Sequence, residues 1–161
     1  MKYDDASWHY GGDLPAELPA EAGGTHIGMF VAWCLLSGLA GEIHATEFPQ
    51  ELEALRERLV TPGAFFLSAC DEKFTDGDLS DEGNRFAAIY YHGDPNPYLA
   101  DYERLFGREH PSLYGVPDTW ESFERLRPTL EYRLQTWRVG KLGSERPPSS
   151  VEARRPWWQL W

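Results

Sequence analysis

The stretch from Ile27 to Ala40 constrains the fold of this chain more than any other feature. Its 14 residues are apolar on nearly every side of a helix, and only two glycines and one serine interrupt them. A helix without a polar face must be covered by other elements, and a membrane span needs roughly 20 apolar residues. The stretch therefore predicts a buried central helix, with Thr25 as its cap and a stop near Gly41, and not a membrane anchor.

Amphipathic periodicity predicts further helices beyond this run. The pairs Thr61–Pro62 and Asn96–Pro97 place a capping residue before a proline, which is typical of helix starts. Asp78 and Asp118 are the expected caps of two more helices, and Pro128 is expected to kink or split the last one. The expected helices cover residues 47–60, 61–70, 78–91, 96–107 and 118–137.

The fold class expected from these patterns is mainly all-α. A chain of 161 residues fits one domain, and a chain of this size can bury roughly two-thirds of its surface. We expect a bundle of about five to seven helices over residues 1–139, with an irregular aromatic N-terminal arm and minor β structure in the first 12 residues. Residues 140–161 are expected to form a flexible Pro/Ser/Arg tail that ends in a tryptophan-rich motif.

The two cysteines, Cys34 and Cys70, lie in apolar stretches and lack the spacing of a metal site. We interpret them as reduced core residues. The first residues of the chain are polar and acidic, and no apolar core of a signal peptide follows them. These features predict a soluble, cytoplasmic protein.

Charge is divided unequally along the chain. Residues 1–109 hold 20 carboxylates and 7 lysines and arginines, whereas residues 110–161 hold 6 carboxylates and 8 basic residues. The formal net charge of the chain is -11. Such an acidic body repels nucleic acids and anionic membranes, and it attracts basic proteins over a distance. We therefore expect a basic protein partner, and neither a nucleic acid nor a membrane.

The most acidic segment runs from Asp71 to Glu82. Its resemblance to a calcium-binding EF-hand is incomplete, because a loop that starts at Asp78 places Ile89 where the bidentate glutamate belongs. The segment is more typical of a solvated loop that leads into a helix cap. Docking of the same loop on a basic partner is a third interpretation.

No catalytic, cofactor-binding or metal-binding constellation stands out from the sequence. The five histidines are scattered and lack the spacing of a zinc hydrolase. The nearest cluster, formed by Glu42, His44 and Glu47, is typical of a solvated turn. Nucleophile elbows and phosphate-binding glycine loops are also missing. We expect a protein that is not an enzyme, with a metal-assisted hydrolase that uses His9, His26 or His44 as the alternative.

Both ends of the chain are rich in aromatic residues. The arm around Trp8 and Tyr10 is expected to pack on the bundle, and a recognition surface is the alternative. The terminal run Arg154–Trp161 carries three tryptophans. We expect it to dock on the acidic body, whereas insertion into a partner would make the protein a housekeeping adaptor.

Four segments resemble an uncharacterised bacterial family of unknown function. They are MKYDDASWHYGGD at the start, GTHIGMFVAW from Gly24, ACDEKFTD from Ala69, and the terminal pattern PWW-x-x-W. The resemblance covers about residues 1–137 and the tail, and it transfers no catalytic residues. It implies an immunity protein that neutralises the cognate toxin of a secreted antibacterial system.

Charge and resemblance lead to one functional hypothesis. We expect an acidic cytoplasmic immunity protein that blocks a basic toxin, such as a nuclease, by direct contact. The aromatic arm and the acidic segment form the expected contact surface. Its expected residues are Asp4, Asp5, Trp8, Asp71, Glu72, Asp76, Asp78, Asp81 and Glu82.

Overall fold

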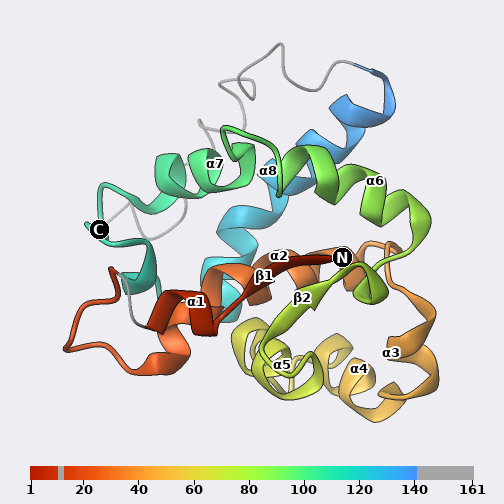
Figure 1. Cartoon of the computed structure of the whole chain (residues 1–161), viewed down its shortest axis with the longest axis horizontal. Coiled ribbons are helices and arrows are strands. Elements are labelled where there is room, and N and C mark those ends of the chain that lie inside the picture. Colours follow the sequence, from red (N-terminus) through yellow and green to blue (C-terminus); the bar gives the residue numbers. More distant parts are fainter. Residues whose placement is uncertain (11–12, 141–161) are drawn as a thin grey trace.

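The computed structural model describes residues 1–10 and 13–140, and its fold is mainly helical, as predicted (Figure 1). The described part contains eight α-helices, six of them with seven or more residues, and one two-stranded sheet. The α-helices are α1 (Ser7–Tyr10), α2 (Thr25–Leu36), α3 (Glu42–Thr46), α4 (Pro49–Arg56), α5 (Pro62–Ala69), α6 (Asp81–Tyr90), α7 (Pro97–Phe106) and α8 (Trp120–Arg138). The strands are β1 (Lys2–Asp5) and β2 (Lys73–Thr75), and the short 3-10 helices are η1 (Ala20–Gly24), η2 (Asp76–Asp78) and η3 (Leu113–Gly115). The expected tail lies outside the described residues except for Gly140.

Helix α2 is the centre of the fold, as its apolar sequence predicts. Eleven of its 12 residues are buried, and in Figure 1 it passes behind β1 through the middle of the molecule. Its ends differ from the prediction, because Thr25 is the first helical residue and the helix stops at Leu36, before Gly41. Gly38 makes this early stop favourable, since it adopts a φ of 80° that residues with a Cβ rarely take.

The predicted caps at Thr61 and Asn96 are confirmed. Each side chain accepts a hydrogen bond from a backbone N–H in the first turn of its helix, α5 and α7 respectively. A proline follows each cap in the first turn, where its missing N–H breaks no helical bond. Pro128 does not split the last helix, because α8 continues through it over 19 residues.

Two predicted caps are wrong, because a neighbouring hydroxyl takes the cap position. Ser80 caps α6 in place of Asp78, and Thr119 caps α8 in place of Asp118. The Asp118 carboxylate reaches the start of α5 instead. There it accepts hydrogen bonds from two backbone N–H groups, at 2.8 and 3.1 Å, and from the Thr61 hydroxyl at 2.5 Å. It thereby ties α5 to the segment that precedes α8.

The sheet joins the N-terminus to the acidic segment. Strands β1 and β2 are antiparallel, with Asp4 opposite Phe74 and Asp5 opposite Lys73. The β structure expected in the first 12 residues is therefore confirmed. The expected solvated loop is wrong for β2, because Phe74 is fully buried and anchors the strand in the core.

A buried network joins α6, α7 and α8. Asp101 is 3% exposed, and its carboxylate accepts hydrogen bonds from Arg133 at 2.7 and 2.9 Å and from the Tyr90 hydroxyl at 2.9 Å. These partners offset the desolvation of the buried charge. Ile89 is 51% exposed because Phe86 and Tyr90 form the inward face of α6.

Candidate functional site

The aromatic arm and the acidic segment, which are separate features of the sequence, lie side by side in the structure (Figure 1). Backbone contacts extend the pairing of β1 with β2 at both ends. The Ala6 N–H donates to the Glu72 carbonyl at 2.9 Å, and the Asp76 N–H donates to the Met1 carbonyl at 2.9 Å. Residues 1–10 and 71–82 therefore form one continuous region, which we call the arm–loop face.

Trp8 is the exposed aromatic residue of the arm–loop face. Its side chain is 59% exposed, and the Lys2 ammonium lies 5.3 Å from the ring centroid. Tyr10 is half-buried, and its hydroxyl donates to the Glu72 carboxylate at 2.9 Å. The expectation that the arm buries its aromatic residues is therefore wrong for Trp8.

Most exposed carboxylates of the arm–loop face have a partner in the chain. The exposed carboxylates of the predicted contact set are Asp71, Asp76 and Asp81. Asp71 forms an ion pair with Lys73, and Asp76 lies 2.6 Å from the N-terminal ammonium group. Glu82 accepts a hydrogen bond from Arg138 at 2.8 Å. Exposed ion pairs of this kind are weak, so these carboxylates stay available to a cationic surface.

Two residues of the predicted contact set are buried and hold the face in place. Asp5 is 5% exposed and accepts hydrogen bonds from Lys2 and Ser7, both at 2.6 Å. Burial acts to raise the pKa of Asp5, but these hydrogen bonds outweigh it and lower the pKa to about 2. Asp78 is 6% exposed and accepts a hydrogen bond from the Thr75 N–H at 2.7 Å.

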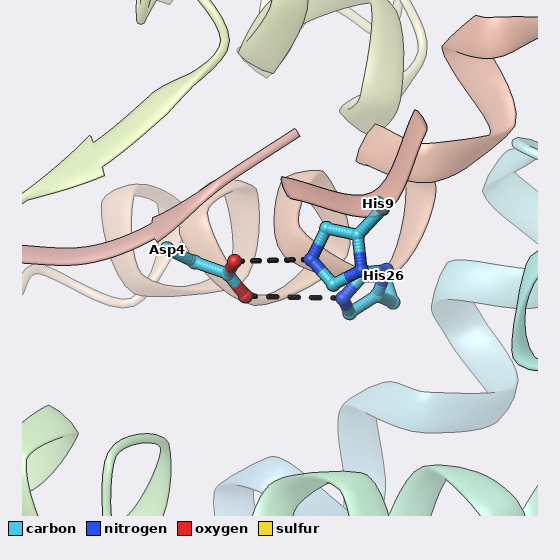
Figure 2. Close-up of side chains that lie close together, drawn as sticks. All are labelled: Asp4, His9 and His26. Atoms are coloured by element: carbon cyan, nitrogen blue, oxygen red, sulfur yellow. Dashed lines mark hydrogen bonds and ion pairs between the residues drawn. The ribbon is translucent and has the colours of Figure 1, made fainter. Parts of the chain in front are cut away.

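Asp4, the remaining carboxylate of the set, meets two histidines from different elements (Figure 2). Its Oδ1 lies 3.1 Å from Nε2 of His9 on α1, and its Oδ2 lies 3.9 Å from Nε2 of His26 on α2. The imidazole planes are nearly perpendicular, at 84°, with ring centroids 4.8 Å apart. The Tyr91 hydroxyl donates to Asp4 Oδ2 at 2.6 Å, and the Tyr114 hydroxyl lies 2.8 Å from His9 Nδ1.

His26 is the least satisfied member of this cluster. It is 1% exposed, and among the described residues neither ring nitrogen has a hydrogen-bond partner. Burial lowers the pKa of His26 to about 3, so the ring is neutral at physiological pH. Burial acts to raise the pKa of Asp4, but hydrogen bonds from His9 and Tyr91 outweigh it and lower the pKa. A neutral imidazole therefore faces an ionised carboxylate, and both are in the protonation state that binds a cation.

A second buried cluster contains His44, Cys70 and Asp78. His44 Nε2 lies 3.0 Å from Asp78 Oδ1. Burial and then the charge of Asp78 raise the pKa of the Cys70 thiol, which keeps the thiol protonated. Both cysteines of the chain are free and buried, as predicted. The interpretation of Glu42, His44 and Glu47 as a solvated turn holds for the two glutamates but is wrong for His44, which is 1% exposed.

Two of the surface hollows that the described residues form could not be inferred from the sequence. One of about 460 Å³ lies between α4 and α8 and is lined by charged side chains. Its charges pair within the chain, since Arg58 lies 2.5 Å from Glu124, and Arg127 lies 2.8 Å from Glu124 and 3.0 Å from Glu131. The other, of about 280 Å³, lies beside α7. Neither is lined by the residues of Figure 2.

The sequence predicts a role for His9 and His26 only in the alternative metal-assisted hydrolase, and it gives no sign of their interactions with Tyr91 and Tyr114. Tyr91 lies 87 residues from Asp4, and Tyr114 lies 105 residues from His9. A single sequence carries no spacing signal at such separations. Packing of β1, α1, the end of α6 and η3 around the start of α2 brings these side chains together.

Fold and site together define a mainly helical protein with a partly buried histidine–carboxylate cluster beside a small sheet. Residues 2–116 match the family model described as Domain of unknown function (DUF7832), and the chain belongs to this family. The expected resemblance to a family of unknown function is thus confirmed, while the link to immunity proteins stays a prediction. No curated protein and no solved structure gives a significant match. Within residues 1–10 and 13–140, no helix combines the length and hydropathy needed to cross a bilayer.

Proposed function

We propose that the protein is an immunity-type binding protein, which neutralises a basic antibacterial toxin such as a nuclease by direct contact through the arm–loop face. The observation that carries this proposal is the pairing of β1 with β2, because it brings the segment with the exposed Trp8 next to the most acidic segment of the chain. In this proposal the protein works in the cytoplasm and does not transform a substrate.

The arm–loop face combines a residue type that contributes binding energy with residue types that set association rate and specificity. Tryptophan is enriched among the residues that dominate interface energies, and Trp8 is exposed without a partner protein. Carboxylates mainly set association rate and specificity, and Asp71, Asp76 and Asp81 are exposed for that purpose. The net charge of -11 adds long-range attraction for a cationic toxin.

Burial separates contact residues from supporting residues. Asp5 and Asp78 are 5% and 6% exposed, so their substitution tests the fold of the face rather than its contact with a partner. The informative substitutions are therefore at Trp8, Asp71 and Asp81. This choice removes the ambiguity between a misfolded surface and a weakened contact.

The experiment begins with the products of adjacent genes. Each product is expressed alone and together with this chain, and growth of the host shows whether the chain relieves a toxic effect. For a toxin found in this way, Asp71→Lys with Asp81→Lys should slow association about tenfold at low salt and less at high salt. The control is Glu47→Lys with Glu51→Lys, which changes the net charge equally at exposed sites on other elements.

The same toxin also tests the role of Trp8. Trp8→Ala should speed dissociation on the order of 30-fold, since truncation of a hot-spot residue costs at least about 2 kcal/mol. Equal slowing of association by both charge variants, together with an unchanged dissociation rate in Trp8→Ala, would remove the arm–loop face from the interface. The absence of any neighbouring toxic product would contradict the proposed function itself.

A further inference from the structure

We propose that Asp4, His9 and His26 bind one divalent transition-metal cation of the zinc class, which fastens β1 and α1 to the central helix α2. Two imidazoles and one carboxylate are a ligand set that Zn²⁺ accepts, with a further position for water. The inference goes beyond the proposed function and does not depend on it, because the cation binds to the isolated protein.

The distances in the cluster suit such a cation. Two atoms bound to one tetrahedral Zn²⁺ at roughly 2.0–2.1 Å lie roughly 3.3 Å apart. The separations of Asp4 Oδ1 from His9 Nε2 and of Asp4 Oδ2 from His26 Nε2, 3.1 and 3.9 Å, bracket this value. One ligand atom from each residue lies within 4.8 Å of the other two. Figure 2 shows both imidazoles turning a nitrogen toward the same carboxylate, so small side-chain rotations complete the site.

The unsatisfied imidazole of His26 is an independent observation that points to a ligand. Buried polar atoms nearly always have a partner, yet His26 is 1% exposed and both of its nitrogens lack a hydrogen bond among the described residues. The Asp4 carboxylate, 3.9 Å away, is too distant for a hydrogen bond. A cation between the two groups satisfies the nitrogen and keeps the carboxylate paired.

The two tyrosines hold the ligands in a suitable orientation. Metal-binding histidines are usually fixed through the ring nitrogen that does not bind the metal. Tyr114 Oη lies 2.8 Å from His9 Nδ1. When a cation takes the place of the Nε2 proton that faces Asp4 in the metal-free chain, Tyr114 can accept a hydrogen bond from Nδ1–H while the Nε2 lone pair binds the cation. Tyr91 donates to Asp4 Oδ2 at 2.6 Å, and the Asp5 N–H donates to Asp4 Oδ1 at 2.8 Å, so the carboxylate is fixed as well.

The position of the site indicates a stabilising cation. The side chains of His9 and Asp4 are 19% and 14% exposed, which leaves a route for the ion from solvent. Neither surface hollow is lined by the three ligands, and the ligands come from β1, α1 and α2. The cation therefore joins elements of the fold at their meeting point.

Calorimetric titration of the chelator-treated full chain with Zn²⁺ tests the proposal, and elemental analysis gives the stoichiometry. We expect one Zn²⁺ per chain, and at least 100-fold weaker binding in His9→Ala, which removes a ligand. The matched control is Cys70→Ala, because Cys70 belongs to the other three-residue cluster. The affinity of this variant should stay within about twofold of the wild type, since its thiol is not a ligand.

Cobalt gives a readout that does not depend on protein stability. Co²⁺ held by nitrogen and oxygen atoms gives visible d–d bands without the near-ultraviolet charge-transfer band that a thiolate adds. Circular dichroism shows whether each variant is folded. Should His9→Ala fail to fold, Tyr114→Phe replaces it, with an expected loss in affinity of about tenfold. A wild-type protein without stoichiometric metal, a thiolate band, or loss of the metal in Cys70→Ala alone would overturn the proposal.

Discussion

His26 and His44 are equally buried, at 1% exposure each, yet their surroundings differ. His44 Nε2 lies 3.0 Å from a carboxylate oxygen of Asp78, whereas the corresponding distance from His26 Nε2 to Asp4 is 3.9 Å. His44 thus has one hydrogen-bonded ring nitrogen, Nε2, whereas both ring nitrogens of His26 lack a partner among the described residues. Burial is the same for the two histidines, so the difference between them lies in how many ring nitrogens have a hydrogen-bond partner.

Asp78 and Asp4 differ in their distance to the buried histidine because their other hydrogen-bond partners differ. Asp78 closes η2, where it also bonds the Thr75 N–H at 2.7 Å and the Thr75 hydroxyl at 3.0 Å. Its geometry is fixed locally, and His44 only has to reach it. In Asp4, Oδ1 is hydrogen-bonded to His9 and Oδ2 accepts a hydrogen bond from Tyr91. Both oxygens therefore have a partner, and His26 forms no hydrogen bond with them.

Acidification in chelator-containing buffer should have the largest effect on stability, through His26. Burial lowers the pKa of His26 to about 3, whereas the unfolded chain titrates near 6.5. Between these values the unfolded state binds a proton that the folded state does not, so stability falls as the pH falls. From pH 7 to pH 4 this loss is on the order of 3 kcal/mol. Urea unfolding of the wild type and of His26→Leu at several pH values measures this loss of stability. Identical pH profiles for the two proteins would contradict the lowered pKa of His26.

Removal of the satisfied carboxylate should have the next largest effect. Asp78→Ala leaves the Thr75 N–H and the His44 ring without their acceptor, which lowers the free energy of unfolding by about 2 kcal/mol. Chemical denaturation at pH 7 gives the value. A loss below about 0.5 kcal/mol would show that the hydrogen bonds of Asp78 do not stabilise the fold.

A matched pair of leucine substitutions sharpens the comparison. In metal-free buffer, His44→Leu should lower the free energy of unfolding by about 1 kcal/mol, because Asp78 loses a hydrogen bond. His26→Leu should leave it within about 0.5 kcal/mol, since no hydrogen bond is lost. Equal losses in the two variants would mean that His26 is as well satisfied as His44.

Trp8→Ala should have the smallest effect on the fold. The side chain is 59% exposed, so its truncation should change the free energy of unfolding by less than about 0.5 kcal/mol. Thermal unfolding checks this expectation. A larger loss would place the indole in the packing of the arm and weaken its role as a free contact residue.

Sequence patterns predict the parts of the fold that depend on neighbouring residues. The apolar run that becomes α2 and the caps at Thr61 and Asn96 are examples, because periodicity and capping are local. The wrong caps at Asp78 and Asp118 arise because each carboxylate bonds a group outside the helix that it was expected to start. Local patterns do not reveal such competition.

The candidate metal site could be predicted only in part. Its histidines are visible as residue types, but His9 and His26 belong to separate elements and have no ligand spacing. Asp4 joins them because β1 pairs with β2 across about 70 residues of sequence. Long-range strand pairing cannot be derived from one sequence with so short a strand, so the cluster becomes apparent only in three dimensions.

The contact between Asp118 and α5 matters for the folding of the chain during synthesis and for the choice of truncated variants. Helix α5 has eight residues. The Gly63 N–H in its first turn donates to Asp118, which is synthesised 55 residues later. A helix this short is marginal on its own. A truncation at the end of the family match, residue 116, therefore removes the acceptor of the Gly63 N–H and leaves the Thr61 side chain as the cap of α5, a helix that packs on α2.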